Sequence, residues 1–166
     1  MLIQLVVYEA GSAPRDVVTR HPGGLGGTVV GLVLVAHSPE LVRGLRAMVA
    51  QAAPGVPVGL AAGSAHGRLG TSAPRVLEAL QETLAASRGD GAVVLVDLGS
   101  ATMAVEIALE EATEAERRLT RLSGGPIVEG AILAAVEAAA GAGLDGVLAA
   151  ADGAAVVPKL PGDERG

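Results

Sequence analysis

The chain has 166 residues, a formal net charge of −6 and 50% hydrophobic residues, but Tyr8 is its only aromatic side chain and it has no cysteine. Its length is that of one domain with a sizeable core, which must be built from aliphatic side chains. The acidic balance argues against a nucleic-acid backbone as partner, and the lack of cysteine excludes disulfides, thiol chemistry and cysteine-based zinc sites.

The first 28 residues carry no sustained hydrophobic period and contain many helix- and strand-breaking residues. We predict a loop or disordered leader at 1–28, which could also be an extension from too early a start codon. Its apolar start lacks the positive segment of a secretory signal, and no later stretch is apolar enough to span a membrane, so we expect a cytoplasmic protein. The folded domain is predicted at 29–155, and 156–166, with two prolines, as a flexible tail.

The first predicted strand and helix frame a histidine. Residues 29–36 form an unbroken apolar run rich in β-branched side chains, which is typical of a strand buried on both faces of a parallel sheet. His37 follows, and Ser38, Pro39 and Glu40 are typical of a helix start. Because open α/β sheets bind ligands at the carboxyl ends of their strands, our working hypothesis is that His37 does chemistry.

The rest of the domain alternates predicted strands and helices. Short β-branched runs indicate the strands, and apolar residues at helical spacing indicate the helices. This alternation predicts an α/β domain with an open, mainly parallel sheet and helices on both faces. Further strands are predicted at 56–61, 92–96 and 117–122, and helices at 39–52 (apolar side Leu41, Leu45, Met48 and Val49), 73–86, 101–115, 127–140 and 144–151.

Three loops that follow successive strands carry the polar residues of a predicted site. The carboxyl ends of parallel strands meet at one edge of the sheet, so we expect these loops to lie close together. They bring one imidazole, one carboxylate, several hydroxyls near helix starts and close-packing glycines. The residues are His37 and Ser38, then Gly70, Thr71 and Ser72, then Asp97, Gly99 and Ser100.

This set lacks the signatures of several enzyme classes but suits a phosphohistidine. The sequence has no Gly-x-Ser-x-Gly elbow, no P-loop, and no Gly-x-Gly-x-x-Gly after the first strand. A neutral imidazole can attack phosphorus with one nitrogen while an acceptor holds the other N–H, and Asp97 is the natural acceptor. Backbone N–H groups at helix starts can receive the phosphoryl oxygens, so we expect no metal or cofactor.

Each residue also has a structural interpretation. A histidine at a strand end can be merely exposed, Asp97 can cap a turn, and the hydroxyls can cap helices. His21 and His66 are expected in solvent, and Glu129 can complement the dipole of its helix. The residues alone therefore leave open a pocket at the strand ends that binds some other ligand.

The chain contains four segments that carry a family resemblance: V-L-V-A-H-S-P-E-L, A-A-G-S-A-H-G-R-L-G-T-S, V-V-L-V-D-L-G-S-A-T-M and P-I-V-E-G-A-I-L-A-A-V. In this order they resemble the DhaM phosphotransferase subunits of PTS-dependent dihydroxyacetone kinases, which have the mannose-type enzyme IIA fold. The resemblance covers about 29–155 and implies a homodimer that the carrier protein HPr phosphorylates on His37, with Asp97 orienting the imidazole. The acceptor would be ADP held in a kinase subunit, which phosphorylates dihydroxyacetone bound on a third subunit.

The sequence departs from the family pattern at two points, and other functions stay open. Ala65 and His66 stand where relatives are expected to have acidic residues, so contacts with partners at this loop are expected to differ. Some relatives also continue into HPr-like and enzyme I-like domains. Since this chain ends at Gly166, we expect a separate phosphoryl carrier. The alternatives are an enzyme IIA of a mannose-type sugar transporter, a non-catalytic ligand-binding module, and a small tetrapyrrole chelatase, although chelatases resemble H-G-S where this chain has H-S-P.

Overall fold

The computed structural model describes residues 29–64 and 68–160, so the leader predicted at 1–28, the Ala65–His66 departure and the last residues of the predicted tail lie outside this part. No helix within these ranges is long and apolar enough to cross a membrane. The elements in chain order are β1 Gly31–Ala36, α1 Pro39–Ala52, β2 Val58–Ala62, α2 Ala73–Ser87, β3 Ala92–Val96, α3 Gly99–Glu111, α4 Glu114–Arg118, β4 Thr120–Leu122, α5 Ile127–Ala139, α6 Leu144–Gly153 and the 3-10 turn η1 Ala154–Val156.

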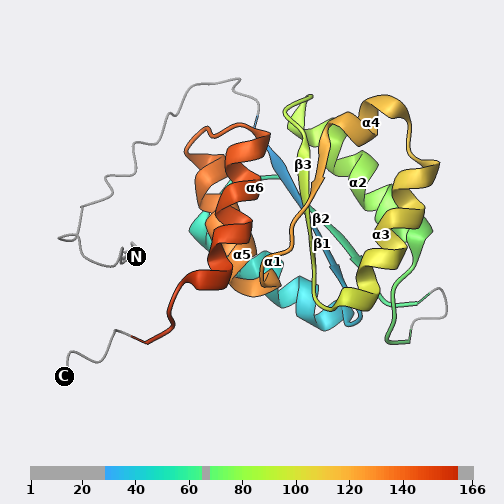
Figure 1. Cartoon of the computed structure of the whole chain (residues 1–166), viewed down its shortest axis with the longest axis horizontal. Helices are drawn as coiled ribbons and strands as arrows, with labels where there is room; N and C mark the ends of the chain where they lie inside the picture. The colour runs from blue at the N-terminus through green and yellow to red at the C-terminus, as the bar shows by residue number, and fades with distance from the viewer. Residues whose placement is uncertain (1–28, 65–67, 161–166) are drawn as a thin grey trace.

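The four strands form one parallel sheet in the order β2-β1-β3-β4, which confirms the predicted fold class. Alternate residues of β1 serve two separate cores, and all six are buried. Leu32 and Leu34 pack with α1, α5 and α6, whereas Val33 and Val35 pack with α2 and α3. The helices therefore cover both faces, as Figure 1 shows, and β1 is a central strand.

Helix α1 has the predicted bounds, but its apolar side agrees with the prediction only at Leu45 and Val49. Its buried residues are Val42, Leu45 and Val49, which lie at helical spacing on the side that faces the sheet. Leu41 and Met48 are exposed, so their assignment to the apolar side was wrong. The ambiguity arises because two overlapping stripes of apolar residues run along this helix.

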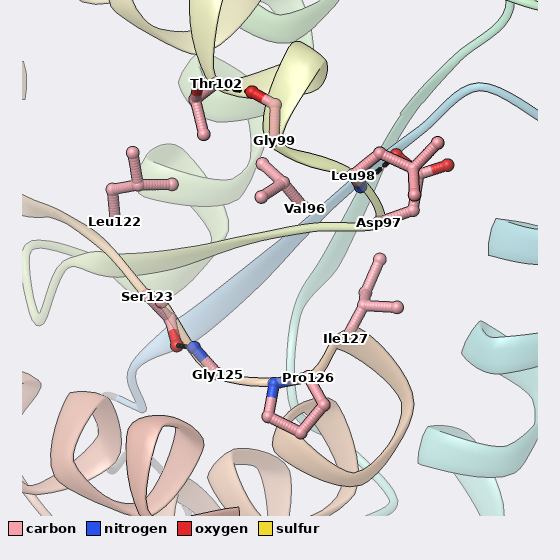
Figure 2. Close-up of a pocket in the computed structure, with 11 residues that line it drawn as sticks. Val96, Asp97, Leu98, Gly99, Thr102, Leu122, Ser123, Gly125, Pro126 and Ile127 are labelled. Atoms are coloured by element: carbon pink, nitrogen blue, oxygen red, sulfur yellow. Dashed lines mark hydrogen bonds between the residues drawn. The ribbon is translucent and has the colours of Figure 1, made fainter. Parts of the chain in front are cut away.

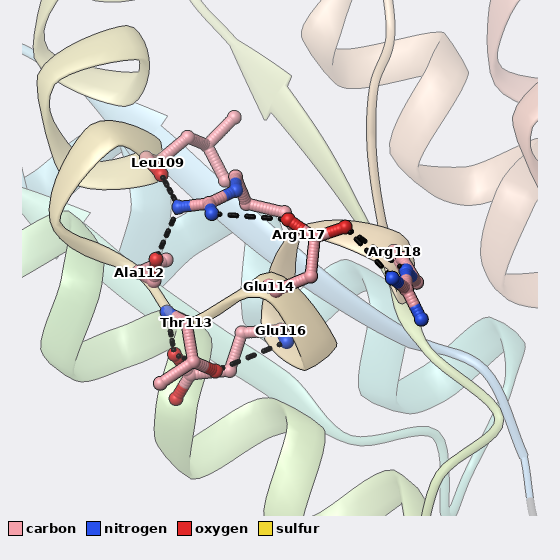
Figure 3. A network of polar contacts seen from close by, with 7 residues as sticks. All are labelled: Leu109, Ala112, Thr113, Glu114, Glu116, Arg117 and Arg118. Carbon is pink, nitrogen blue, oxygen red and sulfur yellow. Dashed lines mark hydrogen bonds and ion pairs between the residues drawn. The ribbon is translucent and has the colours of Figure 1, made fainter.

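The segment between α3 and β4 also differs from the prediction. Helix α3 ends at Glu111 instead of continuing to residue 115, and Arg117 and Arg118 belong to α4 instead of a strand. A capping box causes this: the Thr113 side chain accepts from the Glu116 backbone N–H, and the Glu116 carboxylate accepts from the Thr113 backbone N–H at 2.7 Å (Figure 3). Hydrogen bonds from the Thr113 backbone N–H and from the Thr113 hydroxyl hold the pKa of the Glu116 carboxyl below its ordinary value.

Two glycines let α2 pack closely on the sheet. A Cβ at Gly59 would meet the Thr83 hydroxyl and lie 2.7 Å from the Ala79 carbonyl oxygen, and one at Gly31 would meet the Thr83 methyl group. Contacts this short require the helix or the strand to shift. The small residue at each position therefore sets the distance between α2 and the sheet.

Gly59→Ala should accordingly lower the free energy of unfolding by about 1–3 kcal/mol, the usual cost of overpacking a core. Urea denaturation measures the change. Gly44→Ala is the matched control, because Gly44 is exposed on α1 with no atom near its added Cβ. This control should be neutral or slightly stabilising, since alanine favours a helix interior. Equal stabilities for both variants would contradict the packing account.

Candidate functional site

Strand register brings His37 and Asp97 together. Val35 of β1 pairs with Val96 of β3, and the backbone N–H of Asp97 donates to the Val35 carbonyl at 3.1 Å. His37 lies just beyond the end of β1, and Asp97 just beyond the end of β3. Two neighbouring parallel strands thus present an imidazole and a carboxylate at the same edge of the sheet.

The Asp97 carboxylate holds the imidazole on one side. His37 Nδ1 lies 3.0 Å from Oδ1 and 3.2 Å from Oδ2 of Asp97. Each carboxylate oxygen also accepts a backbone N–H, Oδ2 from His37 at 2.9 Å and Oδ1 from Leu98 at 2.8 Å. Because a carboxylate can only accept, this network assigns the ring proton to Nδ1 and leaves the lone pair on Nε2.

Ser100 meets the other ring nitrogen. Its Oγ lies 3.2 Å from His37 Nε2, where the hydroxyl can donate to the lone pair. The His37 side chain is 28% exposed and that of Asp97 only 11%, so the ring can be reached from the surface while the carboxylate is largely covered. Ser100 does not cap α3 as predicted: it lies in the first turn, and Leu98 occupies the N-cap position.

The predicted loop that holds Gly70, Thr71 and Ser72 contacts His37 through its backbone. Gly70 donates its N–H to the His37 carbonyl at 3.1 Å, and its φ of +147° lies where glycine is favoured. Ser72 occupies the N-cap position of α2, but its side chain forms no capping hydrogen bond there. The structure therefore brings the three loops together, and within the described ranges the side-chain hydrogen bonds between them join His37, Asp97 and Ser100.

Ser38 and Glu40 begin α1 beside the histidine. The Ser38 hydroxyl accepts from the Leu41 N–H at 3.4 Å and donates to the Glu40 carboxylate at 3.1 Å, so this predicted cap is confirmed. Hydrogen bonds from the backbone N–H of Glu40 and from Ser38 hold the pKa of Glu40 below its ordinary value. The helix start is therefore occupied by its own carboxylate.

A fourth loop, missed by the sequence reasoning, borders the site. Residues 123–126 form one wall of a cleft of about 530 Å³, and Asp97, Leu98 and Gly99 contribute to the other (Figure 2). The carboxylate of Asp152 fixes this loop by accepting from the Ser123 hydroxyl at 2.6 Å and the Gly124 N–H at 3.0 Å. The pair is separated by 29 residues, and nothing in the local pattern signals it.

No arginine or lysine within the described ranges forms a hydrogen bond or ion pair with the His37, Asp97 or Ser100 side chain. The polar groups that converge are an imidazole, a carboxylate, a hydroxyl and backbone N–H groups. Such a set can activate Nε2 as a nucleophile. In the described part of the chain, no side-chain cation is bonded to this set to recognise a free anionic substrate.

A family model and curated relatives identify the family of this chain. The model of the PTS system fructose IIA component family matches residues 31–148. A DhaM phosphoryl donor subunit of a PEP-dependent dihydroxyacetone kinase from Klebsiella michiganensis is 36% identical over 124 residues, which is 72% of this chain. The chain spans only 26% of that relative.

Two shorter proteins match over most of their own length. The DhaM phosphotransferase subunit of a PTS-dependent dihydroxyacetone kinase from Lactococcus lactis is 32% identical over 117 residues, or 70% of this chain and 89% of the relative. The crystal structure of EF1359, a protein of unknown function, superposes with a TM-score of 0.67 at 26% identity and covers 75% of this chain and 94% of that one.

Proposed function

This chain belongs to the PTS system fructose IIA component family, and from that premise we propose that it is the phosphohistidine carrier of a dihydroxyacetone kinase. The observation that carries the proposal is the arrangement around His37. Asp97 holds the Nδ1 proton and Nε2 keeps a lone pair beside one hydroxyl. That arrangement suits a nucleophile that accepts and then releases a group.

In the first transfer, the lone pair of His37 Nε2 attacks the phosphorus of a phosphorylated HPr. The new N–P bond forms as the bond from phosphorus to the HPr histidine breaks, and the HPr nitrogen keeps that electron pair. The Nδ1 proton stays between His37 and Asp97, and the carboxylate stabilises the positive charge that develops on the ring. The Ser100 hydroxyl can rotate from Nε2 to a phosphoryl oxygen.

In the second transfer, the phosphoryl group passes to ADP bound in a kinase subunit. The N–P bond breaks, the terminal phosphate oxygen of ADP forms the new bond, and the product ATP phosphorylates dihydroxyacetone on another subunit. Ser38, Gly70, Thr71, Ser72 and Gly99 complete the loops that the phosphoryl group and the partners would contact. The proposal includes a homodimer in the cytoplasm and needs no metal or cofactor.

A reconstituted phosphoryl chain tests the proposal. The full chain is incubated with ³²P-phosphoenolpyruvate, enzyme I and HPr, and the label should reach one site per chain. It should be acid-labile and base-stable, as expected for a phosphoramidate, and should depend on HPr. Adding the ADP-bearing kinase subunit with dihydroxyacetone should remove the label. A chain that stays unlabelled with all components active would exclude the carrier function.

A second function is favoured by the family model, whose description is that of a fructose IIA component. In that case the phosphohistidine would serve a sugar transporter of the mannose type. The site would be the same, and only the acceptor would differ. In the assay above, label that the kinase subunit leaves in place, and that a membrane-associated sugar component removes, would select this function.

A further inference from the structure

Helix α6 carries a carboxylate at the end where its dipole disfavours one. Asp152 lies in the last turn of α6, close to the partial negative charge of the helix C-terminus. None of the ion pairs within the described ranges includes it. Its contacts are instead hydrogen bonds to the loop 123–126, which lies 28 and 29 residues away in the sequence. A residue that departs from a local preference in this way is typical of a functional position.

Both hydrogen bonds of Asp152 end on one oxygen. Its Oδ1 accepts the Ser123 hydroxyl at 2.6 Å and the Gly124 N–H at 3.0 Å. Ser123 is only 2% exposed, and its Oγ accepts in turn the Gly125 N–H at 3.1 Å. A Cβ at Gly125 would meet the Ala151 carbonyl oxygen, so the loop packs directly on the end of α6. The position of this loop is therefore set by α6.

The loop places the start of α5 beside Asp97. Ile127, directly after the loop, is 9% exposed and belongs to the same buried cluster as Ala36 and Leu95. These two residues lie one position before His37 and two positions before Asp97. Figure 2 shows the Ile127 side chain directed from the start of α5 toward the Asp97 loop, and both line the same cleft. The position of this apolar side chain therefore limits how much water reaches the carboxylate that holds the imidazole.

Resting on the proposed function, we propose that Asp152 is a positioning residue for phosphoryl transfer, which acts through the loop 123–126 on the surroundings of Asp97. A carboxylate stabilises a charged ring more strongly where less water competes for it. With the loop held, Asp97 stays largely covered and keeps the ring proton of His37 on Nδ1. With the loop released, Ile127 shifts, water enters the cleft, and Asp97 holds that proton less firmly.

Variants on both sides of the hydrogen bond test this assignment in the full chain. Asp152→Ala removes both bonds from α6, and Ser123→Ala removes the hydroxyl from the loop. In initial-rate labelling from phospho-HPr, each should lower kcat roughly tenfold and leave KM within about twofold of the wild type. The double variant should be no slower than Asp152→Ala, because both changes break one network. Since a single oxygen accepts both bonds, Asp152→Asn should keep at least about half of the wild-type kcat.

A control and a second readout accompany the rates. Asp145→Ala is the matched control, because Asp145 is an exposed carboxylate in the first turn of the same helix and pairs with Arg121. It should keep the wild-type kcat. The ¹⁵N NMR shifts of the His37 ring need no phosphoryl donor: the Nε2-protonated form should gain population in Asp152→Ala and not in Asp152→Asn. Urea unfolding establishes that each compared variant is folded at the assay temperature.

The positioning role and the carrier function fail in different ways. If Asp152→Ala keeps the wild-type kcat and tautomer, Asp152 only stabilises the loop, and the carrier function stands. Equal losses in Asp152→Ala and Asp152→Asn would assign the effect to the charge and overturn a role through the hydrogen bonds. A rise in KM alone would make the loop a partner contact and also overturn it. If even the wild type takes no label, the carrier function is wrong, and the ring NMR still decides the positioning role.

Discussion

An alanine in place of His37 should abolish phosphoryl acceptance. The His37 side chain supplies the lone pair on Nε2 that attacks phosphorus. Asp97 and Ser100, whose side chains contact the ring, cannot form a phosphoramidate because these side chains contain no nitrogen. The initial rate of labelling from phospho-HPr should fall by roughly a thousandfold or more, to the background of the assay. The fold should persist, because the ring is partly exposed and the Asp97 carboxylate keeps two backbone N–H donors.

The two other histidines of the chain provide the controls. His21→Ala and His66→Ala change the same residue type elsewhere in the sequence and should retain wild-type labelling. Circular dichroism and the midpoint of urea unfolding should show that His37→Ala is folded. A folded His37→Ala protein that still takes up base-stable label would show that another residue is the acceptor, and the proposed chemistry would be wrong.

Replacing Asp97 by asparagine should slow the transfer without removing it. Both carboxylate oxygens of Asp97 accept a backbone N–H, one from His37 and one from Leu98. An asparagine amide in either orientation points its NH₂ group at one of these donors. One backbone donor is then unsatisfied, and the imidazole loses the charge that stabilises its protonated Nδ1. We expect kcat for phosphoryl uptake to fall roughly a hundredfold, with KM for phospho-HPr little changed.

The tautomer of His37 distinguishes an orienting role of Asp97 from a purely structural one, because a purely structural role would leave the tautomer unchanged. In the wild type the ¹⁵N NMR shifts of the ring should show the proton on Nδ1, and in Asp97→Asn the Nε2-protonated form should gain population. Asp145→Asn is the matched control, because Asp145 is exposed and pairs only with Arg121 in the described structure. An unchanged transfer rate in Asp97→Asn, with a folded protein, would make Asp97 a turn residue only.

Much of the fold follows from local patterns, because strands and helices alternate and each has a clear hydrophobic period. The bounds of α1 and β3 are as predicted, and the meeting of His37 with Asp97 was expected from parallel strands. The short helix α4 was not predicted, although its sequence signal is local. Thr113 and Glu116 have the spacing of a capping box, and this spacing indicates that a new helix begins there and that the preceding helix ends before Thr113.

Other features depend on contacts between distant residues and carry no local signal. The Ser123 loop is held by Asp152, and this pairing becomes visible only when α6 is placed beside the end of β4. The role of Ser100 was also open, because the helix start could be shifted by one or two residues and would then turn the hydroxyl away from the ring. Contacts between distant residues also decide the apolar side of α1. Val42 is buried and Leu41 is exposed because the sheet packs against the side of the helix that carries Val42.

The pairing of β1 with β3 also bears on how much the site must reorganise during a transfer. His37 and Asp97 are attached to adjacent strands whose register is set by buried side chains, and a slip of one residue would turn both away from each other. The dipoles around the nucleophile are therefore preorganised, and little free energy is spent on arranging them when charge develops. Differences in rate between two partners must then arise from how each partner presents its own reacting atom.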